Sequence, residues 1–168
     1  YEILRCLVGS EMCIRDRVKT VGVTGEFVTG SHGVTVKADL KPEEISFNNI
    51  DGVVLPGGMP GTVNLGKSET VTKAAVHCAE NGKITAAICA APSVLGNLGI
   101  LKGKKATCFP GFEKELEGAT YTAAPVEIDG NVITGKGAGC AILFGKAIVE
   151  KAVSAEAANK VCGDMQCP

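Results

Sequence analysis

The sequence predicts a single-domain α/β protein with a doubly wound, mainly parallel sheet and helices on both faces. Short apolar segments at 51–55 and 84–88 have the composition of strands that are buried on both faces of a parallel sheet. Helical patterns follow both segments, and this alternation of strands and helices predicts the layered architecture. A length of 168 residues favours one domain.

The segments before the first buried strand predict short strands and turns. Residues 18–23 are rich in β-branched side chains, which favours a strand. Residues 25–36 predict two short strands that are joined by a turn at 30–33. The polar, proline-containing segment 41–50 predicts a helical turn or a loop.

The middle of the chain predicts two helices. Residues 64–81 predict one helix that stops at Asn81-Gly82. Its apolar positions recur at helical spacing and are Val71, Ala74, Ala75 and Cys78. A second helix is predicted over 93–98, because Pro92 suits the first turn of a helix.

The C-terminal third predicts short elements and then a long helix. A strand is expected at 105–108 and a helical turn at 112–116. Asp129-Gly130-Asn131 predicts a hairpin between segments 125–128 and 132–134. An amphipathic helix is expected over 140–153, and a short helix after Ser154. The apolar face of the long helix should carry Ala141, Phe144, Ile148 and Ala152.

The composition excludes several classes of partner. The net charge is −1 and there is no basic stripe, which argues against nucleic acid and anionic membranes as partners. No apolar run approaches the ~20 residues that a membrane span needs. We therefore expect a cytoplasmic protein.

The eight cysteines predict neither a metal site nor a disulfide framework. There is no C-x-x-C pair, and only Cys162 and Cys167 lie near each other in the sequence. We expect Cys78 and Cys108 to be small buried apolar residues, and we expect no metal and no cofactor.

Cys89 is the candidate reactive residue, because it stands where a predicted strand ends and a helix begins. The positive end of that helix favours a thiolate, which could attack a carbonyl carbon. The second strand end, with Gly57 and Gly58, could bring backbone N–H groups close to the oxyanion that forms. Spacing alone leaves open the alternative that Cys89 is simply a buried cysteine.

Three segments resemble the DJ-1 family of the DJ-1/PfpI superfamily: DGVVLPGGMPGTVNL (51–65), ITAAICAAPSVLGNLGILKGKKAT (84–107) and VITGKGAGCAILFGKAIVE (132–150). The similarity extends from about Val18 to about Val153. It implies a flavodoxin-like fold, a homodimer, and Cys89 as the reactive, easily oxidised nucleophile. It also implies that Gly58 and Ala90 supply the oxyanion-binding N–H groups.

The resemblance implies several activities. The first is action on small reactive carbonyls, of the glyoxalase III or deglycase type. The second is a non-catalytic role as an oxidative-stress sensor or chaperone, and some bacterial relatives carry an older ThiJ label from thiamine synthesis. Amidotransferase-like or peptidase-like hydrolysis is disfavoured, because segment 106–116 lacks the histidine that protease-like members have.

The two histidines receive different interpretations. His32 stands where relatives commonly carry a basic residue at the mouth of the pocket, and the alternative is a solvated histidine in a turn. His77 is expected at the surface of the predicted helix 64–81.

Residues 1–17 do not fit the resemblance. Residues 6–17 (CLVGSEMCIRDR) resemble a translated sequencing adaptor, so 1–17 is expected to be a non-native leader before a domain at 18–168. The family's first strand, its helix and a proton-transferring glutamate are expected to be missing, which would slow proton transfer by about 10²–10⁴-fold. We expect residues 2–8 to fill the place of the missing strand in the sheet.

Overall fold

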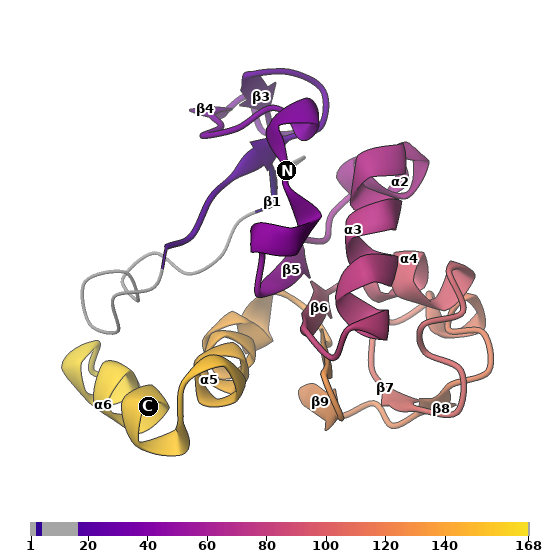
Figure 1. The fold of residues 1–168 in the computed structure, drawn as a ribbon. Helices are drawn as coiled ribbons and strands as arrows, with labels where there is room; N and C mark the ends of the chain where they lie inside the picture. Colours follow the sequence, from indigo (N-terminus) through magenta and orange to yellow (C-terminus); the bar gives the residue numbers. More distant parts are fainter. Residues whose placement is uncertain (1–2, 5–16, 168) are drawn as a thin grey trace.

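The computed structural model describes residues 3–4 and 17–167, and a four-stranded sheet lies at its centre (Figure 1). The strand order is β5-β6-β10-β9; the first three strands are parallel, and β9 is antiparallel to β10. The bounds are β5 (Gly52–Leu55), β6 (Ile84–Ile88), β9 (Val126–Asp129) and β10 (Val132–Gly135). The predicted α/β class with a mainly parallel sheet is confirmed.

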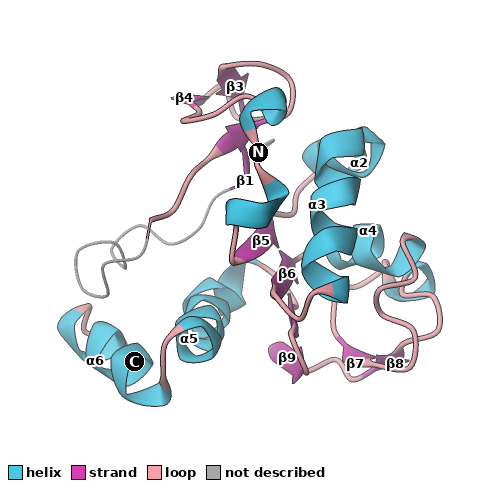
Figure 2. Ribbon diagram, viewed as in Figure 1, coloured by secondary structure: helices cyan, strands magenta, loops and turns pink. Residues whose placement is uncertain are grey.

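Helices cover both faces of this sheet (Figure 2). Alternate side chains of a strand point to opposite faces, so Ala87 of β6 packs with one core cluster and Ala86 with the other. The first cluster lies under α3 (Glu69–Glu80) and α4 (Pro92–Asn97). The second lies under α5 (Ala141–Ala152).

The predicted single helix over 64–81 is wrong, because the segment forms two helices. These are α2 (Gly61–Lys67) and α3, and Ser68 separates them with extended backbone angles. The Ser68 hydroxyl accepts a hydrogen bond from the Val71 N–H at 3.5 Å, which caps α3. A serine that satisfies a helix N-terminus in this way favours the start of a new helix over continuation of the old one.

The predicted hairpin at Asp129-Gly130-Asn131 is confirmed, and its turn also ties the sheet to α3. The Asn131 side-chain amide donates to the carbonyl oxygens of Lys83 at 2.9 Å and Ala79 at 3.1 Å. Carbonyl groups at a helix C-terminus lack partners within the helix, so this amide satisfies groups that would otherwise need water.

The two C-terminal helices pack against each other, as Figure 1 shows. Phe144 and Ile148 of α5 are buried as predicted, whereas Ala141 and Ala152 are exposed at its two ends. The last helix, α6 (Ala155–Asp164), is capped by the Ser154 hydroxyl, which accepts from the Ala157 N–H at 3.1 Å.

Shorter elements surround this core. β8 was not predicted from the sequence; it forms a two-residue parallel pair with β7. The short strands are β2 (Val21–Gly22), β3 (Phe27–Thr29), β4 (Thr35–Lys37), β7 (Lys105–Ala106) and β8 (Thr120–Tyr121). The single-turn helices are η1 (Pro42–Glu44), η2 (Phe47–Asn49), η3 (Glu113–Glu115) and η4 (Ala138–Cys140).

The described part of the N-terminal segment is β1 (Ile3–Leu4). β1 pairs antiparallel with β2 and also contacts β5. It belongs to a two-stranded ladder and not to the four-stranded sheet, so its described residues do not show the predicted insertion into that sheet. Residues 2 and 5–8 of the predicted strand, and most of the predicted leader, lie outside the described residues.

His77 is half-buried, which corrects the expected surface position. Its ring stacks on Phe47 with 6.0 Å between the ring centroids. Its Nε2 atom is buried and has no hydrogen-bond partner among the described residues. The reason is that η2 packs over this face of α3.

No described helix is long and apolar enough to cross a membrane.

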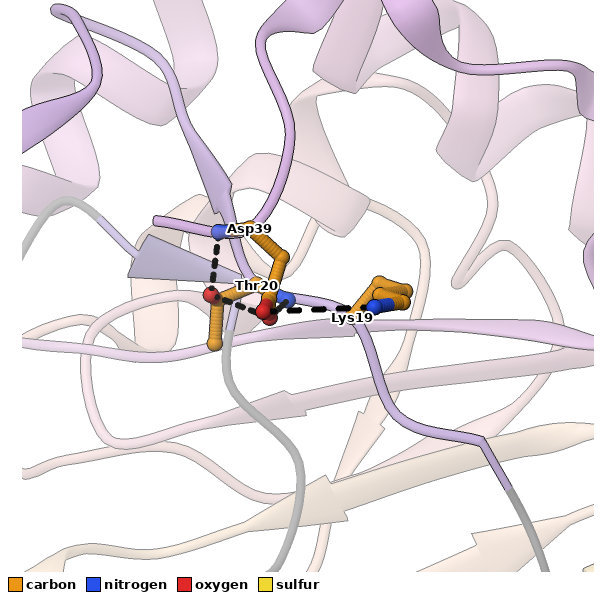
Figure 3. A network of polar contacts seen from close by, with 3 residues as sticks. All are labelled: Lys19, Thr20 and Asp39. Atoms are coloured by element: carbon orange, nitrogen blue, oxygen red, sulfur yellow. Dashed lines mark hydrogen bonds and ion pairs between the residues drawn. The ribbon is translucent and has the colours of Figure 1, made fainter. Parts of the chain in front are cut away.

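A polar network joins residues 19–20 to residue 39 beside this core (Figure 3). The Asp39 carboxylate accepts from both the N–H and the hydroxyl of Thr20, each at 2.8 Å. The Lys19 Nζ atom lies 4.0 Å from the Asp39 Oδ1 atom. The Asp39 N–H in turn donates to the Thr20 hydroxyl at 3.0 Å. These hydrogen bonds, chiefly the one from the Thr20 N–H, lower the pKa of Asp39 below its ordinary value of 3.8.

Asp39→Asn should weaken the fold at neutral pH and not in acid. A carboxylate with a lowered folded-state pKa stabilises the fold above its ordinary pKa, and that stabilisation is lost as pH falls through the folded value. We expect the free energy of unfolding in urea to fall by roughly 0.5–1 kcal/mol at pH 7, because the network is exposed. The exposed Glu117→Gln is the control, and an equal deficit for Asp39→Asn at pH 7 and pH 3 would contradict the prediction.

Candidate functional site

Cys89 forms the turn between β6 and α4. Its φ angle is +66°, in the left-handed region that side chains other than glycine rarely adopt. Such a conformation costs on the order of 1–3 kcal/mol and persists only where surrounding contacts hold it. Cys89 is half-buried, so part of this residue is open to solvent at the turn.

Two backbone hydrogen bonds fix this turn. The Cys89 N–H donates to the Gly135 carbonyl oxygen at 2.8 Å, and the Cys89 carbonyl oxygen accepts from the Phe109 N–H at 2.8 Å. Sequence reasoning missed both partners because they are distant in the chain. The glycine-rich end of β10 was the available signal for Gly135, since β10 pairs with β6 and Gly135 lies opposite Ile88.

The second turn, after β5, lies directly against the first. A Cβ atom added to Gly57 would lie 2.5 Å from the Cys89 Cβ and 2.9 Å from the Ala90 nitrogen, and would also collide with the Ile88 carbonyl oxygen. Glycine is therefore required at this position. The contact arises because β5 and β6 are parallel, with Leu55 opposite Ala87, so both strands end at one edge of the sheet.

Two backbone N–H groups in the turns around Cys89 have no hydrogen-bond acceptor among the described residues. They are the N–H groups of Gly58 and Ala90. Their carbonyl oxygens are occupied: Gly58 accepts from Thr62 at 2.8 Å, and Ala90 accepts from the Ser93 hydroxyl at 2.6 Å. Gly58 has a φ of +101°, which suits glycine. The structure thus brings Cys89, Gly58 and Ala90 together at one edge of the sheet.

Cys108 lies in the segment that follows β7 and is completely buried. Burial raises the pKa of its thiol to about 11, and the charges of Glu113 and Cys89 add to the effect. Cys78 is also fully buried. The expectation that both cysteines are buried apolar residues is confirmed.

The hydrogen-bond contact of His32 lies outside the two turns that carry Cys89, Gly58 and Ala90. It is exposed in the turn between β3 and β4, and its Nδ1 lies 3.2 Å from the Ser31 hydroxyl. No hydrogen bond among the described residues links His32 to the Cys89 turn, and its position at a pocket mouth stays a prediction.

The surroundings of the site contain a cavity but no cluster typical of a metal centre. The described residues contain no group of three or more His, Cys, Asp or Glu side chains that could hold a metal ion. A cavity of about 370 Å³ lies beside α2 and α4; Met59 and Ser93, which adjoin the two turns, help to line it. Cys89 does not line that cavity.

Comparisons with known sequences support a single family. The DJ-1/PfpI family model matches residues 15–151. The chain is 36% identical over 140 residues to the DJ-1 homolog B of Arabidopsis thaliana, which covers 82% of this chain and 32% of that protein. It is 33% identical over 148 residues to the dj-1beta protein of Drosophila melanogaster, and this match covers 86% of this chain and 79% of that protein. A deglycase of Pyrococcus abyssi is 36% identical over 112 residues, and this match covers 65% of this chain and 66% of that protein.

Solved structures agree with the sequence comparisons. The crystal structure of Drosophila melanogaster DJ-1beta has a TM-score of 0.81 and 32% identity, and the match covers 88% of this chain and 81% of that one. Schizosaccharomyces pombe DJ-1 has a TM-score of 0.85 and 26% identity, and the match covers 95% of this chain and 90% of that one. The chain spans about a third of the length of the Arabidopsis relatives, 32% and 35%.

Gly57→Ala should disrupt the site and destabilise the fold. The new methyl group would collide with backbone atoms of Ile88 and Ala90 that cannot move without breaking the turn. We expect a loss of about 2–3 kcal/mol in the free energy of unfolding, measured in urea. Gly139→Ala, where an added Cβ meets nothing within 4 Å, should change stability by less than about 0.5 kcal/mol. Equal stability of the two variants would contradict the close contact.

Alkylation should separate Cys89 from the buried cysteines. With a pKa of about 11, only about 10⁻³ of Cys108 is thiolate at pH 8. Iodoacetamide at pH 8 should therefore label Cys89 in the folded protein and leave Cys78 and Cys108 unlabelled, as read by peptide mass spectrometry. All of them should react after denaturation. Labelling of Cys108 as fast as Cys89 in the folded state would refute the assigned burial.

Proposed function

This chain belongs to the DJ-1/PfpI family, and we propose that it acts on small reactive carbonyl compounds with Cys89 as the nucleophile. One observation carries the proposal. Cys89 is a half-buried residue with a φ of +66°, and it lies beside the turns that carry the Gly58 and Ala90 N–H groups, which have no acceptor among the described residues. A nucleophile beside fixed, unpaired donors is the arrangement that carbonyl addition requires.

The proposed reaction begins with addition of the Cys89 thiolate to an aldehyde carbon. The C=O π electrons move to oxygen, and the Gly58 and Ala90 N–H groups stabilise the oxyanion, which takes up a proton to give a hemithioacetal. With a 2-oxoaldehyde such as methylglyoxal, the proton on the first carbon then moves to the second carbon, and the hydroxyl proton moves to the oxygen of the second carbon, which leaves a thioester. Water hydrolyses the thioester to the 2-hydroxy acid and frees the thiol, so water and aldehyde together account for the product.

The relatives support this assignment by class. The Pyrococcus abyssi relative is named a deglycase, which points to chemistry on carbonyl-derived adducts. The relatives from Drosophila melanogaster and Arabidopsis thaliana have names that contain DJ-1 and mention no activity.

We propose a homodimer as the working assembly, as the family resemblance implies.

A second candidate function uses the same sulfur without turnover. Cys89 would be oxidised by peroxide to the sulfinate, and the free N–H groups of Gly58 and Ala90 would stabilise its negative charge. The partial exposure of Cys89 favours this function as well, because an oxidant must reach the residue. The protein would then report oxidative stress or act as a chaperone.

Lactate formation from methylglyoxal separates the two functions. We expect the wild-type protein to form lactate above the protein-free rate and Cys89→Ser to lose about 10²-fold or more of that excess, because a neutral hydroxyl is a far weaker nucleophile than a thiolate. Cys140→Ser is the matched control, since Cys140 is also half-buried but begins a different helix. Equal rates for wild type and Cys89→Ser would leave only the sensor or chaperone function.

A further inference from the structure

The C-terminal end of α6 forms a turn that brings two cysteines close together in space. Gln166 has a φ of +53°. The Gln166 N–H donates to the Gly163 carbonyl oxygen at 3.0 Å, and the Cys167 N–H donates to the Cys162 carbonyl oxygen at 2.9 Å. This pair of nested hydrogen bonds around one left-handed residue is the Schellman motif. In that motif the side chains of the first and last residues usually make an apolar contact, and here both are cysteines.

Cys162 and Cys167 are free cysteines, each half-buried, and the hydrogen bonds of the turn hold the two residues close together. Desolvation raises the pKa of Cys167 above its ordinary value, and the adjacent Cys162 adds to this. Both side chains help to line a groove of about 190 Å³ between α5 and α6, together with Val149, Val161 and Met165. The two cysteines therefore share one groove, and each residue is partly open to solvent.

We propose that Cys162 and Cys167 are a dithiol that hydrogen peroxide converts to an intramolecular disulfide. One sulfur attacks a peroxide oxygen, the O–O bond breaks, and a sulfenic acid and water form. The second sulfur attacks the sulfenic sulfur, the S–O bond breaks, and the departing hydroxide takes up a proton to become water. Overall, two thiols and one peroxide give one disulfide and two waters.

The fold favours the disulfide over separate oxidation of the two sulfurs. The hydrogen bonds of the turn already hold residues 162 and 167 together, so closing the ring costs little further chain entropy. The second step needs a thiolate, so disulfide formation should become faster as pH rises from 7 toward 9.

This dithiol is separate from the Cys89 site. α6 packs against α5, on the face of the sheet opposite to the one that α4 covers (Figure 1). The oxidation does not use Cys89, Gly58 or Ala90. The proposal therefore stands whether or not the protein acts on carbonyls.

Peptide mass spectrometry tests the proposal directly. Trypsin cleaves after Lys160, and the peptide 161–168 carries Cys162, Cys167 and no other cysteine. After mild peroxide treatment and alkylation of the remaining thiols, this peptide should lack both alkyl groups and have lost two hydrogens. The loss should reverse with dithiothreitol and be unchanged in Cys89→Ser. Oxidation of Met165 adds oxygen and is distinguished by mass.

Two variants at one position test the role of the turn. Gln166→Gly keeps the left-handed conformation and should form the disulfide at the wild-type rate. Gln166→Pro forbids that conformation and removes an N–H, and should slow the reaction about tenfold or more. Since a variant could fold poorly, wild-type protein in concentrated urea provides a second comparison and should show the same slowing.

Three results would overturn the proposal. The first is sulfinate or sulfonate on the two cysteines without a disulfide between them. The second is a disulfide that links two chains, seen as a covalent dimer in non-reducing electrophoresis. The third is an equal rate for folded protein, unfolded protein and Gln166→Pro, which would show that the turn contributes nothing.

Discussion

The contact between Gly57 and the Cys89 turn is the constraint on which the site depends. Parallel pairing of β5 with β6 brings the ends of both strands to one edge, and the turns that follow meet with no room for a Cβ atom. Cys89 can occupy a left-handed conformation because its N–H and its carbonyl are each bound by a different part of the chain. The energy stored in that turn, on the order of 1–3 kcal/mol, is offset by the packing of the sheet around it.

The cysteines show how strongly local structure decides thiol chemistry. Cys78 and Cys108 are fully buried, and burial raises both of their pKa values. Cys89 is half-buried at a strained turn. The N–H groups of Gly58 and Ala90 in the adjoining turns have no acceptor among the described residues. Cys162 and Cys167 are held close together by a backbone turn and line one groove. One residue type therefore occupies three environments that differ in access, charge and proximity.

The sequence predicted what depends on local pattern and on resemblance. The strands around 51–55 and 84–88, the hairpin at Asp129-Gly130-Asn131 and the α/β class are all confirmed. The break at Ser68 was missed because apolar spacing continues through it, whereas the cap is a single hydrogen bond that periodicity does not report. The half-buried His77 was missed for another reason: η2, which covers it, is distant in sequence.

The candidate site was predictable only in part. Cys89 and Gly58 were found because they follow strand ends, whereas Ala90 came from the family resemblance; the structure places all three in two adjoining turns. Gly135 and Phe109, which fix the Cys89 backbone, lie beyond reach of local patterns because their contacts follow from strand order. The Cys162–Cys167 pair was visible as a spacing of five, but its meaning depends on the left-handed Gln166, which no propensity rule assigns to glutamine.

The two thiol sites are joined by contacts, yet the fold gives no reason for one to control the other. An unbroken path exists: α6 packs on α5, and Phe144 of α5 lies against Gly135, whose carbonyl holds the Cys89 N–H. Coupling along such a path requires an element with two stable arrangements. α5 is a regular helix with Phe144 and Ile148 buried in the core, and closing a turn at the end of α6 leaves that packing as it is. The strained turn and the paired cysteines are therefore two independent sites within one fold.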